Sequence, residues 1–161
     1  MQREAPPTLT IPTGLANDLH WLMARAARGL GQQVEASLVG LGVSTRGYVV
    51  LASLTDGAHR SQLAIAQSAA IDKSTLVGVL DELERGGLVK RQADRADRRN
   101  RIVTITDTGR ATLALASAAV RQVDEQALGH LDGTTRRMFL DTLTRLGTGL
   151  TAGTFDTRPA I

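Results

Sequence analysis

Apolar residues recur at steps of three and four along most of the chain, which is the spacing of one face of an α-helix. The first such stripe runs from Leu15 to Leu38, and Thr13 is placed to cap the start of that helix. No proline lies between Thr13 and Arg158, so the strongest helix breaker is missing from the interior. The pattern predicts a mainly α chain that begins with a long helix.

Three residues that can cap helices divide the middle of the chain. Ser44, Ser61 and Asp72 each precede a helical stretch, and their side-chain oxygens can accept hydrogen bonds from the free amides of a first turn. The stretch after Ser61 predicts a short helix over 62–67, and the stretch after Asp72 predicts a longer helix that ends at the glycine pair 86–87. Together they predict a helix-turn-helix.

The hydrophobic pattern changes from a helical to a β period after this motif. Residues 88–91 and 102–105 have β-branched or alternating character, and the segment 92–101 between them is polar and charged. This predicts a small β-hairpin with a long tip. A helix-turn-helix followed directly by a hairpin is a winged helix.

Two further apolar stripes follow the hairpin, with Asp107 and Asp132 as their expected N-caps. A winged helix cannot cover the first helix and both of these as well, so we expect them to pack against each other and against a second copy. The expected organisation is a single domain over 13–151, with a winged helix-turn-helix part at 44–110, dimerisation helices at 13–42 and 108–151, and flexible tails at 1–12 and 152–161.

Composition narrows the class of protein further. The chain has 161 residues, 42% apolar and 22% charged, so it can bury one core. It contains no cysteine, which excludes a disulfide framework, a thiolate zinc site and a cysteine nucleophile. No stretch reads as a membrane span or a secretory signal. The expected compartment is a reducing cytoplasm, with no membrane association.

The basic residues favour duplex nucleic acid as a partner. Of 19 basic residues, 17 are arginine, and the net charge is +3. The planar guanidinium suits phosphates and guanine edges. Only 2% of residues are aromatic, which argues against single-stranded nucleic acid, because that binding mode stacks bases on aromatic rings. Double-stranded DNA is therefore the expected partner.

Basic residues concentrate in the hairpin. Because the hairpin follows a potential recognition helix, its arginines can enter a narrow minor groove, and Asp97 can hold Arg99 in one rotamer. The alternatives are a solvated loop and, for Asp97, a simple turn residue. The hairpin residues expected to form the DNA-binding wing are Arg95, Asp97, Arg98, Arg99 and Arg101; Lys90 and Arg91 add to the wing's charge.

The helix after Asp72 is the expected recognition helix, because the first residues of the second helix of such a motif meet base edges in the major groove. Lys73 can contact phosphate, Val77 a thymine methyl, and Gly78 would allow close approach. The alternative for Gly78 is a surface residue that only weakens the helix. The residues expected to contact DNA are Lys73, Ser74, Thr75, Val77 and Gly78.

Two other helix starts can bind phosphates through their free amides. Ser44 and Ser61 mark these starts, and Arg46 and Arg60 stand beside them. Ordinary surface charge explains the two arginines equally well.

Several strings in order resemble the MarR family of winged-helix transcription regulators, over about residues 44–110. The resemblance implies a homodimer on a pseudo-palindromic operator, and it places Asp97 and Arg99 on the family's wing motif, in which the aspartate orients a minor-groove arginine. This chain departs from the family at Val77 and Gly78, where Thr and Arg are common. The matching strings are Gln62-Leu63-Ala64, Ile71-Asp72-Lys73-Ser74-Thr75-Leu76, Leu80 to Val89, Asp97-Arg98-Arg99 and Thr104 to Arg110.

The resemblance also implies an effector, since many relatives release DNA when a small, often anionic aromatic molecule binds. An aromatic ring and a nearby arginine can hold such a molecule, but ordinary packing is the simpler explanation for each residue. The sequence offers His20, Trp21, Arg25 and Tyr48.

No enzyme, metal or cofactor motif is present. The three histidines are far apart, and neither a phosphate loop nor a nucleophile elbow occurs. The sequence therefore predicts a sequence-specific DNA-binding regulator, a ligand-responsive repressor, without enzymatic activity. The alternative is a winged helix that binds another protein, and a steep salt dependence of duplex binding distinguishes DNA binding from it.

Overall fold

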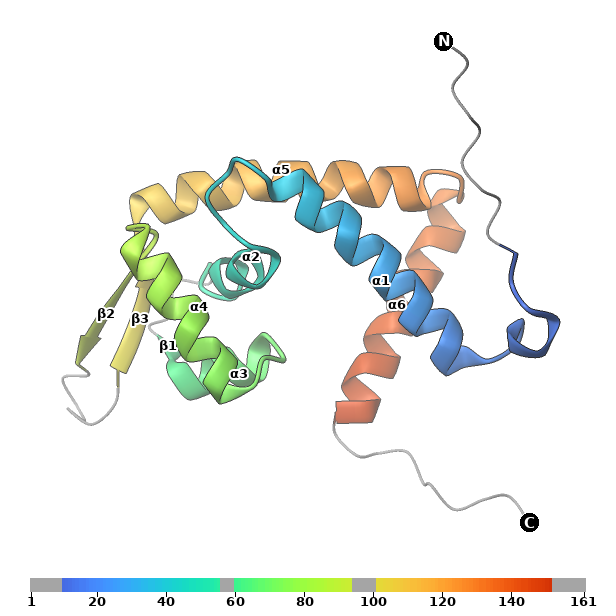
Figure 1. Cartoon of the computed structure of the whole chain (residues 1–161), viewed down its shortest axis with the longest axis horizontal. Coiled ribbons are helices and arrows are strands. Elements are labelled where there is room, and N and C mark those ends of the chain that lie inside the picture. Colours follow the sequence, from blue (N-terminus) through green and yellow to red (C-terminus); the bar gives the residue numbers. More distant parts are fainter. Residues whose placement is uncertain (1–9, 56–59, 94–100, 152–161) are drawn as a thin grey trace, which may run out of the picture. The chain divides into compact units, whose positions relative to one another are not determined.

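The computed structural model of the chain describes residues 10–55, 60–93 and 101–151, with Arg60 and Thr151 described by their backbone alone (Figure 1). It is mostly helical with one small sheet, as predicted. Its elements in chain order are a 3-10 helix η1 (Thr13–Leu15), α1 (Leu19–Leu38), α2 (Thr45–Ala52), β1 (Arg60–Ser61), α3 (Gln62–Ser68), α4 (Lys73–Arg85), β2 (Val89–Ala93), β3 (Arg101–Ile105), α5 (Asp107–Leu128) and α6 (Gly133–Thr151).

The chain divides into two compact units, Met1–Val123 and Asp124–Ile161, with the boundary inside α5. We describe each unit by itself.

Among the helices that the structure describes, none is alone long and apolar enough to cross a membrane. Only α3 and α4 taken together, with a bend of 107° between them, have sufficient length and apolar composition.

The first long helix begins later than predicted. Thr13 starts the 3-10 turn and does not cap α1; the cap is Asp18, whose carboxylate accepts a hydrogen bond from the Trp21 amide at 2.8 Å. Aspartate is among the strongest N-cap residues, so the helix starts directly after Asp18, whose carboxylate satisfies one of the free amides of the first turn.

The three caps predicted for the helix-turn-helix region are confirmed. Ser44, Ser61 and Asp72 accept from the amides of Gly47, Ala64 and Thr75 respectively. The turn between α3 and α4 places Ala70 at a φ of 51°, a left-handed conformation that non-glycine residues rarely adopt. The cap at Asp72 therefore fixes the start of α4 directly after a tight turn.

The predicted hairpin is present, and a third strand joins it. β2 pairs antiparallel with β3, with Val89 opposite Ile105 and Ala93 opposite Arg101. The two residues of β1 pair with the other side of β3, so the order is β1-β3-β2 and β2 is an edge strand. Periodicity cannot reveal a strand of two residues, and β1 was not predicted.

The core of the first unit lies between α2, α3, α4 and the sheet. Leu51, Ile65, Leu80 and Val103 are all fully buried there. A second buried cluster joins α1 to α5 and consists of Val34, Leu38, Ala116 and Val123. These contacts hold α4 firmly by one face and leave its other face in solvent.

The start of α5 is attached to the corner between α4 and β2. Thr106 caps this helix, contrary to the prediction for Asp107: its Oγ1 accepts from the Gly109 amide at 2.9 Å and donates to the Gly87 carbonyl at 2.7 Å. The Thr106 amide donates to the Leu88 carbonyl at 3.0 Å. The Thr106 hydroxyl caps α5 and also bonds to the corner between α4 and β2. Asp107 is already the first residue of α5, so it does not occupy the cap position.

The second unit contains α6, whose predicted cap Asp132 is confirmed: its carboxylate accepts from the amides of Thr134 and Thr135. None of the described side chains of α6 is buried. Met138, Phe139 and Leu140 are 66%, 44% and 46% exposed. An apolar helix surface of this kind is typical of an interface.

Candidate nucleic-acid interface

The outer face of α4 carries the residues predicted for DNA contact. Leu76, Val79, Leu80 and Leu83 are buried in the core. The helical period then turns four of the predicted residues outward, Lys73, Ser74, Val77 and Gly78, and leaves Thr75 half-buried at the first turn. The first two turns of α4 therefore present one lysine and three small residues to solvent.

The cap of α4 also orients one of these residues. Asp72 Oδ1 accepts from the Thr75 amide at 2.9 Å and from the Ser74 hydroxyl at 2.5 Å. These hydrogen bonds, that of the Ser74 side chain above all, hold the pKa of Asp72 well below its usual range. Because the only hydroxyl proton of Ser74 is used by Asp72, Ser74 has lone pairs left for a donor on a base edge.

Nothing inside the described part of the chain requires a glycine at position 78. A Cβ built there would meet no heavy atom within 4 Å, and its backbone is helical. A glycine in an exposed helix interior lowers stability relative to alanine. The glycine is therefore explained either by a partner that approaches the helix closely or by a neutral surface position.

The residues predicted for phosphate contact lie at the predicted helix starts. Ser44 and Ser61 each accept an amide hydrogen bond at 3.2 Å, and Arg46 is exposed on the first turn of α2. Arg60 begins β1, directly before Ser61. Both serines are thus N-caps in the structure, whatever further contact they make.

Of the predicted wing residues, only Arg101 is described. It is exposed at the start of β3, opposite Ala93. The others, Arg95, Asp97, Arg98 and Arg99, lie outside the described residues.

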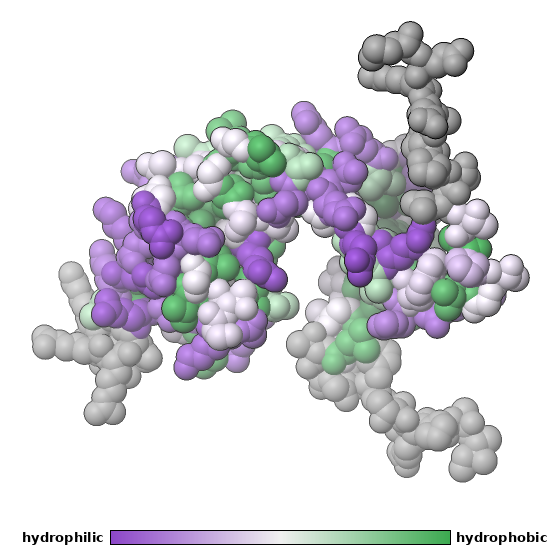
Figure 2. Space-filling view, viewed as in Figure 1, coloured by the Kyte–Doolittle hydropathy of each residue, from purple (hydrophilic) through white to green (hydrophobic). Residues whose placement is uncertain are grey.

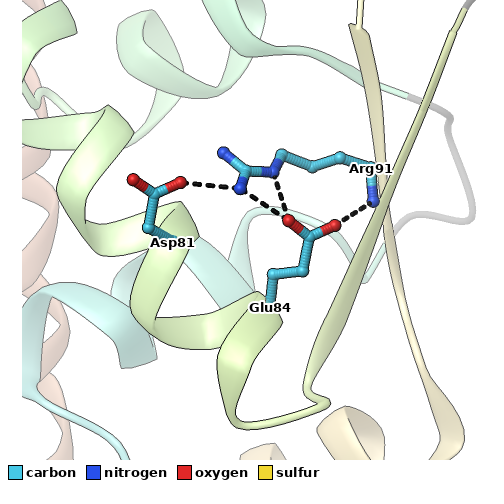
Figure 3. A network of polar contacts seen from close by, with 3 residues as sticks. All are labelled: Asp81, Glu84 and Arg91. Carbon is cyan, nitrogen blue, oxygen red and sulfur yellow. Dashed lines mark hydrogen bonds and ion pairs between the residues drawn. The ribbon is translucent and has the colours of Figure 1, made fainter.

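Arg91, which the sequence counts among the basic residues of the hairpin, is paired with two carboxylates of α4. Its Nη2 lies 2.6 Å from Asp81 and 2.5 Å from Glu84 of α4, its Nε donates to Glu84 at 2.8 Å, and its amide donates to Glu84 Oε1 at 3.1 Å (Figure 3). We call these three residues the Arg91 cluster. The hydrogen bond with Glu84 raises the pKa of Arg91 and lowers that of Glu84.

The Arg91 cluster is part of a strongly polar surface. Figure 2 shows hydrophilic residues gathered over the C-terminal half of α4 and the neighbouring hairpin. A cavity of about 290 Å³ on this side is lined by Gln62, Glu84, Arg91 and Arg101. The acidic members of the cluster could have been noticed in the sequence, since Asp81 and Glu84 are spaced to share one helix face.

The residues predicted for an effector are brought together only in part. The Arg25 guanidinium lies 5.2 Å from the centre of the Trp21 ring, a cation–π contact within α1. Tyr48 is half-buried on α2 and packs against both buried clusters of the first unit, whereas His20 is exposed. Among the described residues, no group of three or more His, Asp or Glu side chains could hold a metal ion.

Known proteins resemble this chain over most of its length. The profile of the MarR family matches residues 45–100. The HTH-type transcriptional repressor Rv2887 of Mycobacterium tuberculosis is 33% identical over 136 residues, which are 83% of this chain and 98% of that protein. A crystal structure of Rv2887 in complex with p-aminosalicylic acid has a TM-score of 0.65 at 31% identity, covering 80% of this chain and 98% of that one.

Solved structures of Rhodococcus regulators are also similar to this chain. A MarR family transcriptional regulator from Rhodococcus sp. RHA1 has a TM-score of 0.78 at 30% identity, covering 84% of this chain and 96% of that one. The repressor CouR bound to a 23-mer DNA duplex has a TM-score of 0.78 at 27% identity, covering 86% and 99%. CouR from Rhodococcus jostii RHA1 bound to p-coumaroyl-CoA has a TM-score of 0.75 at 30% identity, covering 84% and 95%.

Proposed function

Because this chain belongs to the MarR family of transcription regulators, we propose that it is a sequence-specific repressor that binds double-stranded DNA as a homodimer and is released by a small effector. The observation that carries the proposal is the exposed first half of α4, capped by Asp72, with a basic hairpin beside it. Its relatives are regulators, and we propose no catalytic activity and no cofactor for it. The corresponding compartment is the cytoplasm.

The geometry fits a winged-helix mode of docking. The N-terminal half of α4 enters the major groove, where Lys73, Ser74, Thr75, Val77 and Gly78 meet base edges and phosphates. The hairpin reaches the adjacent minor groove. The starts of α2 and α3, with Ser44, Arg46, Arg60 and Ser61, hold the phosphate backbone between them.

The second copy covers the apolar surface of α6. Two such protomers form a two-fold dimer, whose half-sites on the operator lie about 34 to 36 Å apart, one helical turn of DNA. In this dimer residues 13–151 act as one domain despite the two compact units.

For the effector we propose an aromatic molecule that carries an acidic group. The relatives CouR and Rv2887 have been seen with p-coumaroyl-CoA and p-aminosalicylic acid. In this chain Trp21 supplies an aromatic face and Arg25 a guanidinium for a carboxylate, with His20 and Tyr48 as further contacts.

Binding to DNA fragments selected from the parent genome tests the proposal. The purified protein should retain a small set of fragments, and affinity for them should fall steeply with salt, with a slope of about 0.9 per neutralised phosphate in logarithmic units. Weak binding to all duplexes alike, or none, would favour a protein-interaction module.

We predict that Arg99→Ala weakens operator binding by about 1 to 3 kcal/mol and leaves the dimer intact, because a minor-groove guanidinium is lost. Fluorescence anisotropy on the selected operator measures the loss, and sedimentation checks the dimer. Asp97→Ala should reproduce part of the loss by freeing the Arg99 rotamer. Unchanged affinity of Arg99→Ala would remove the wing from the mechanism.

We predict that Gly78→Ala acts in opposite directions on folding and on binding. The free energy of unfolding should rise by about 0.5 to 1 kcal/mol, since the new methyl meets open space and alanine favours the helix. Operator affinity should fall about tenfold because the methyl intrudes on the groove. Urea unfolding and anisotropy measure the two effects. A variant that is more stable and binds equally well would make Gly78 a neutral surface residue.

A further inference from the structure

In addition to the core packing at its base, the β2–β3 hairpin is joined to α4 by hydrogen bonds and ion pairs at two separate places. The first is the turn that joins them, where Gly87 has a φ of 69° and the Leu88 amide donates to the Leu83 carbonyl at 2.8 Å. The second is the Arg91 cluster, farther along β2. Core packing of Val89 and Val103 and the pairing of β3 with β1 also fix the base of the hairpin. The Arg91 cluster lies beyond the buried Val89, next to the exposed Gln92 and Ala93, so it holds the outer half of β2 against α4.

The chemistry of the second attachment suits this task. Arg91 is the middle residue of β2. It donates hydrogen bonds to Glu84 of α4 from both its backbone amide and its guanidinium. Asp81 and Glu84, three residues apart on α4, both reach Nη2. The planar, pre-organised guanidinium fixes direction better than an ammonium group can.

Folding stability is not the whole effect of the cluster. Its side chains are 21%, 47% and 38% exposed for Arg91, Asp81 and Glu84, so water screens part of the attraction, although a network of this kind keeps more of it than an isolated surface pair. Two acidic groups also lower the positive charge of a surface that the proposed function places near DNA. This loss of positive charge opposes DNA binding unless the geometry that the cluster fixes compensates for it.

We propose that Arg91 is a positioning residue: held by Asp81 and Glu84, it fixes the hairpin relative to α4 so that both reach their grooves at once. The inference rests on the proposed function for its consequence, but the positioning itself is a property of the free protein. Pre-set geometry lowers the entropy lost when a two-part surface binds.

The test uses a substitution that should change operator affinity in opposite directions under the positioning role and under simple electrostatics. Removing a carboxylate near DNA should tighten binding if charge alone matters. We expect Glu84→Ala to weaken operator binding about tenfold instead. The matched control is Glu82→Ala, which removes the same charge two residues away on α4 and, among the described residues, breaks no ion pair. It should bind equally well or more tightly.

Substitutions of Arg91 itself test the same contact, and a conservative one should restore part of the lost affinity. Arg91→Gln breaks the ion pairs with both Asp81 and Glu84, so it should lose at least as much affinity as Glu84→Ala. The double variant should lose less than the sum of the two, since both changes act on the same cluster. Arg91→Lys should recover part of the loss by keeping one ion pair. Additive losses, or a Glu84→Ala variant that binds more tightly, would make Arg91 a direct DNA contact and overturn the proposal.

A distance measurement in free protein separates this inference from the proposed function. The chain has no cysteine, so spin labels can be placed by Lys73→Cys on α4 and Gln92→Cys on β2, both exposed positions. Pulsed electron spin resonance should give a narrow distribution of distances that broadens with Arg91→Gln. An unchanged distribution refutes the positioning role even if the operator is bound, and a broadened one supports it even if no operator is found.

Discussion

Deleting residues 136–161 should convert the dimer into a monomer whose first unit remains folded. The deletion removes nearly all of α6, none of whose described side chains is buried within the chain, so the core between α2, α4 and the sheet keeps its contacts. Without α6, the second copy loses the apolar surface formed by residues such as Met138 and Phe139. Sedimentation equilibrium measures the mass, and circular dichroism measures the retained helix.

The same deletion should weaken operator binding by a factor of about 10² to 10⁴, because the two half-sites are then bound independently. Removal of residues 152–161 alone is the control and should leave the dimer whole. A full-length Phe139→Glu variant tests the same surface without truncation and should also dissociate. A deletion variant that stays a well-folded dimer would show that the interface lies elsewhere.

Gly109→Ala should cost about 3 kcal/mol of the free energy of unfolding. A Cβ at this position would overlap the Leu88 carbonyl oxygen and lie 2.9 Å from Ile105 Cγ1. The obstacle is backbone, which cannot turn aside as a flexible side chain can, so α5 must move away from the corner between α4 and β2. Urea unfolding followed by circular dichroism measures the loss.

The Gly78→Ala variant is the natural comparison, since it adds the same methyl to a helix at a site with open space. The two variants should therefore shift stability in opposite directions. If Gly109→Ala unfolds at the same urea concentration as the unaltered protein, the close contact between α5 and Leu88 does not hold in solution.

Local signals were enough to place most of the helices. Ser44, Ser61, Asp72 and Asp132 were predicted as caps, and each accepts the expected amide hydrogen bonds. An N-cap depends on the residue and its next three neighbours, so it can be read from a short stretch of sequence. The helix-turn-helix and the hairpin followed from these starts and from the change of period.

Most departures from the predictions arose where contacts with a distant part of the chain decide the local structure. Thr106 replaces Asp107 as a cap because its hydroxyl also bonds to Gly87, 19 residues earlier. Arg91 was counted in the charge of the wing, and α4 supplies two carboxylates that offset it. Thr13 was a local error, because Asp18 offered a stronger cap nearby. The site roles on α4 and in the wing remain predictions, since they concern a partner.

The strand order also bears on solubility in a crowded cell. An edge strand carries unpaired amides that can recruit a strand from another molecule and start aggregation. β2 is such an edge, and one of its amides, that of Arg91, is already occupied by a carboxylate from α4. Charged side chains at this margin further discourage a foreign strand from docking. The contact that orients the hairpin thereby also guards the protein against self-association through its sheet.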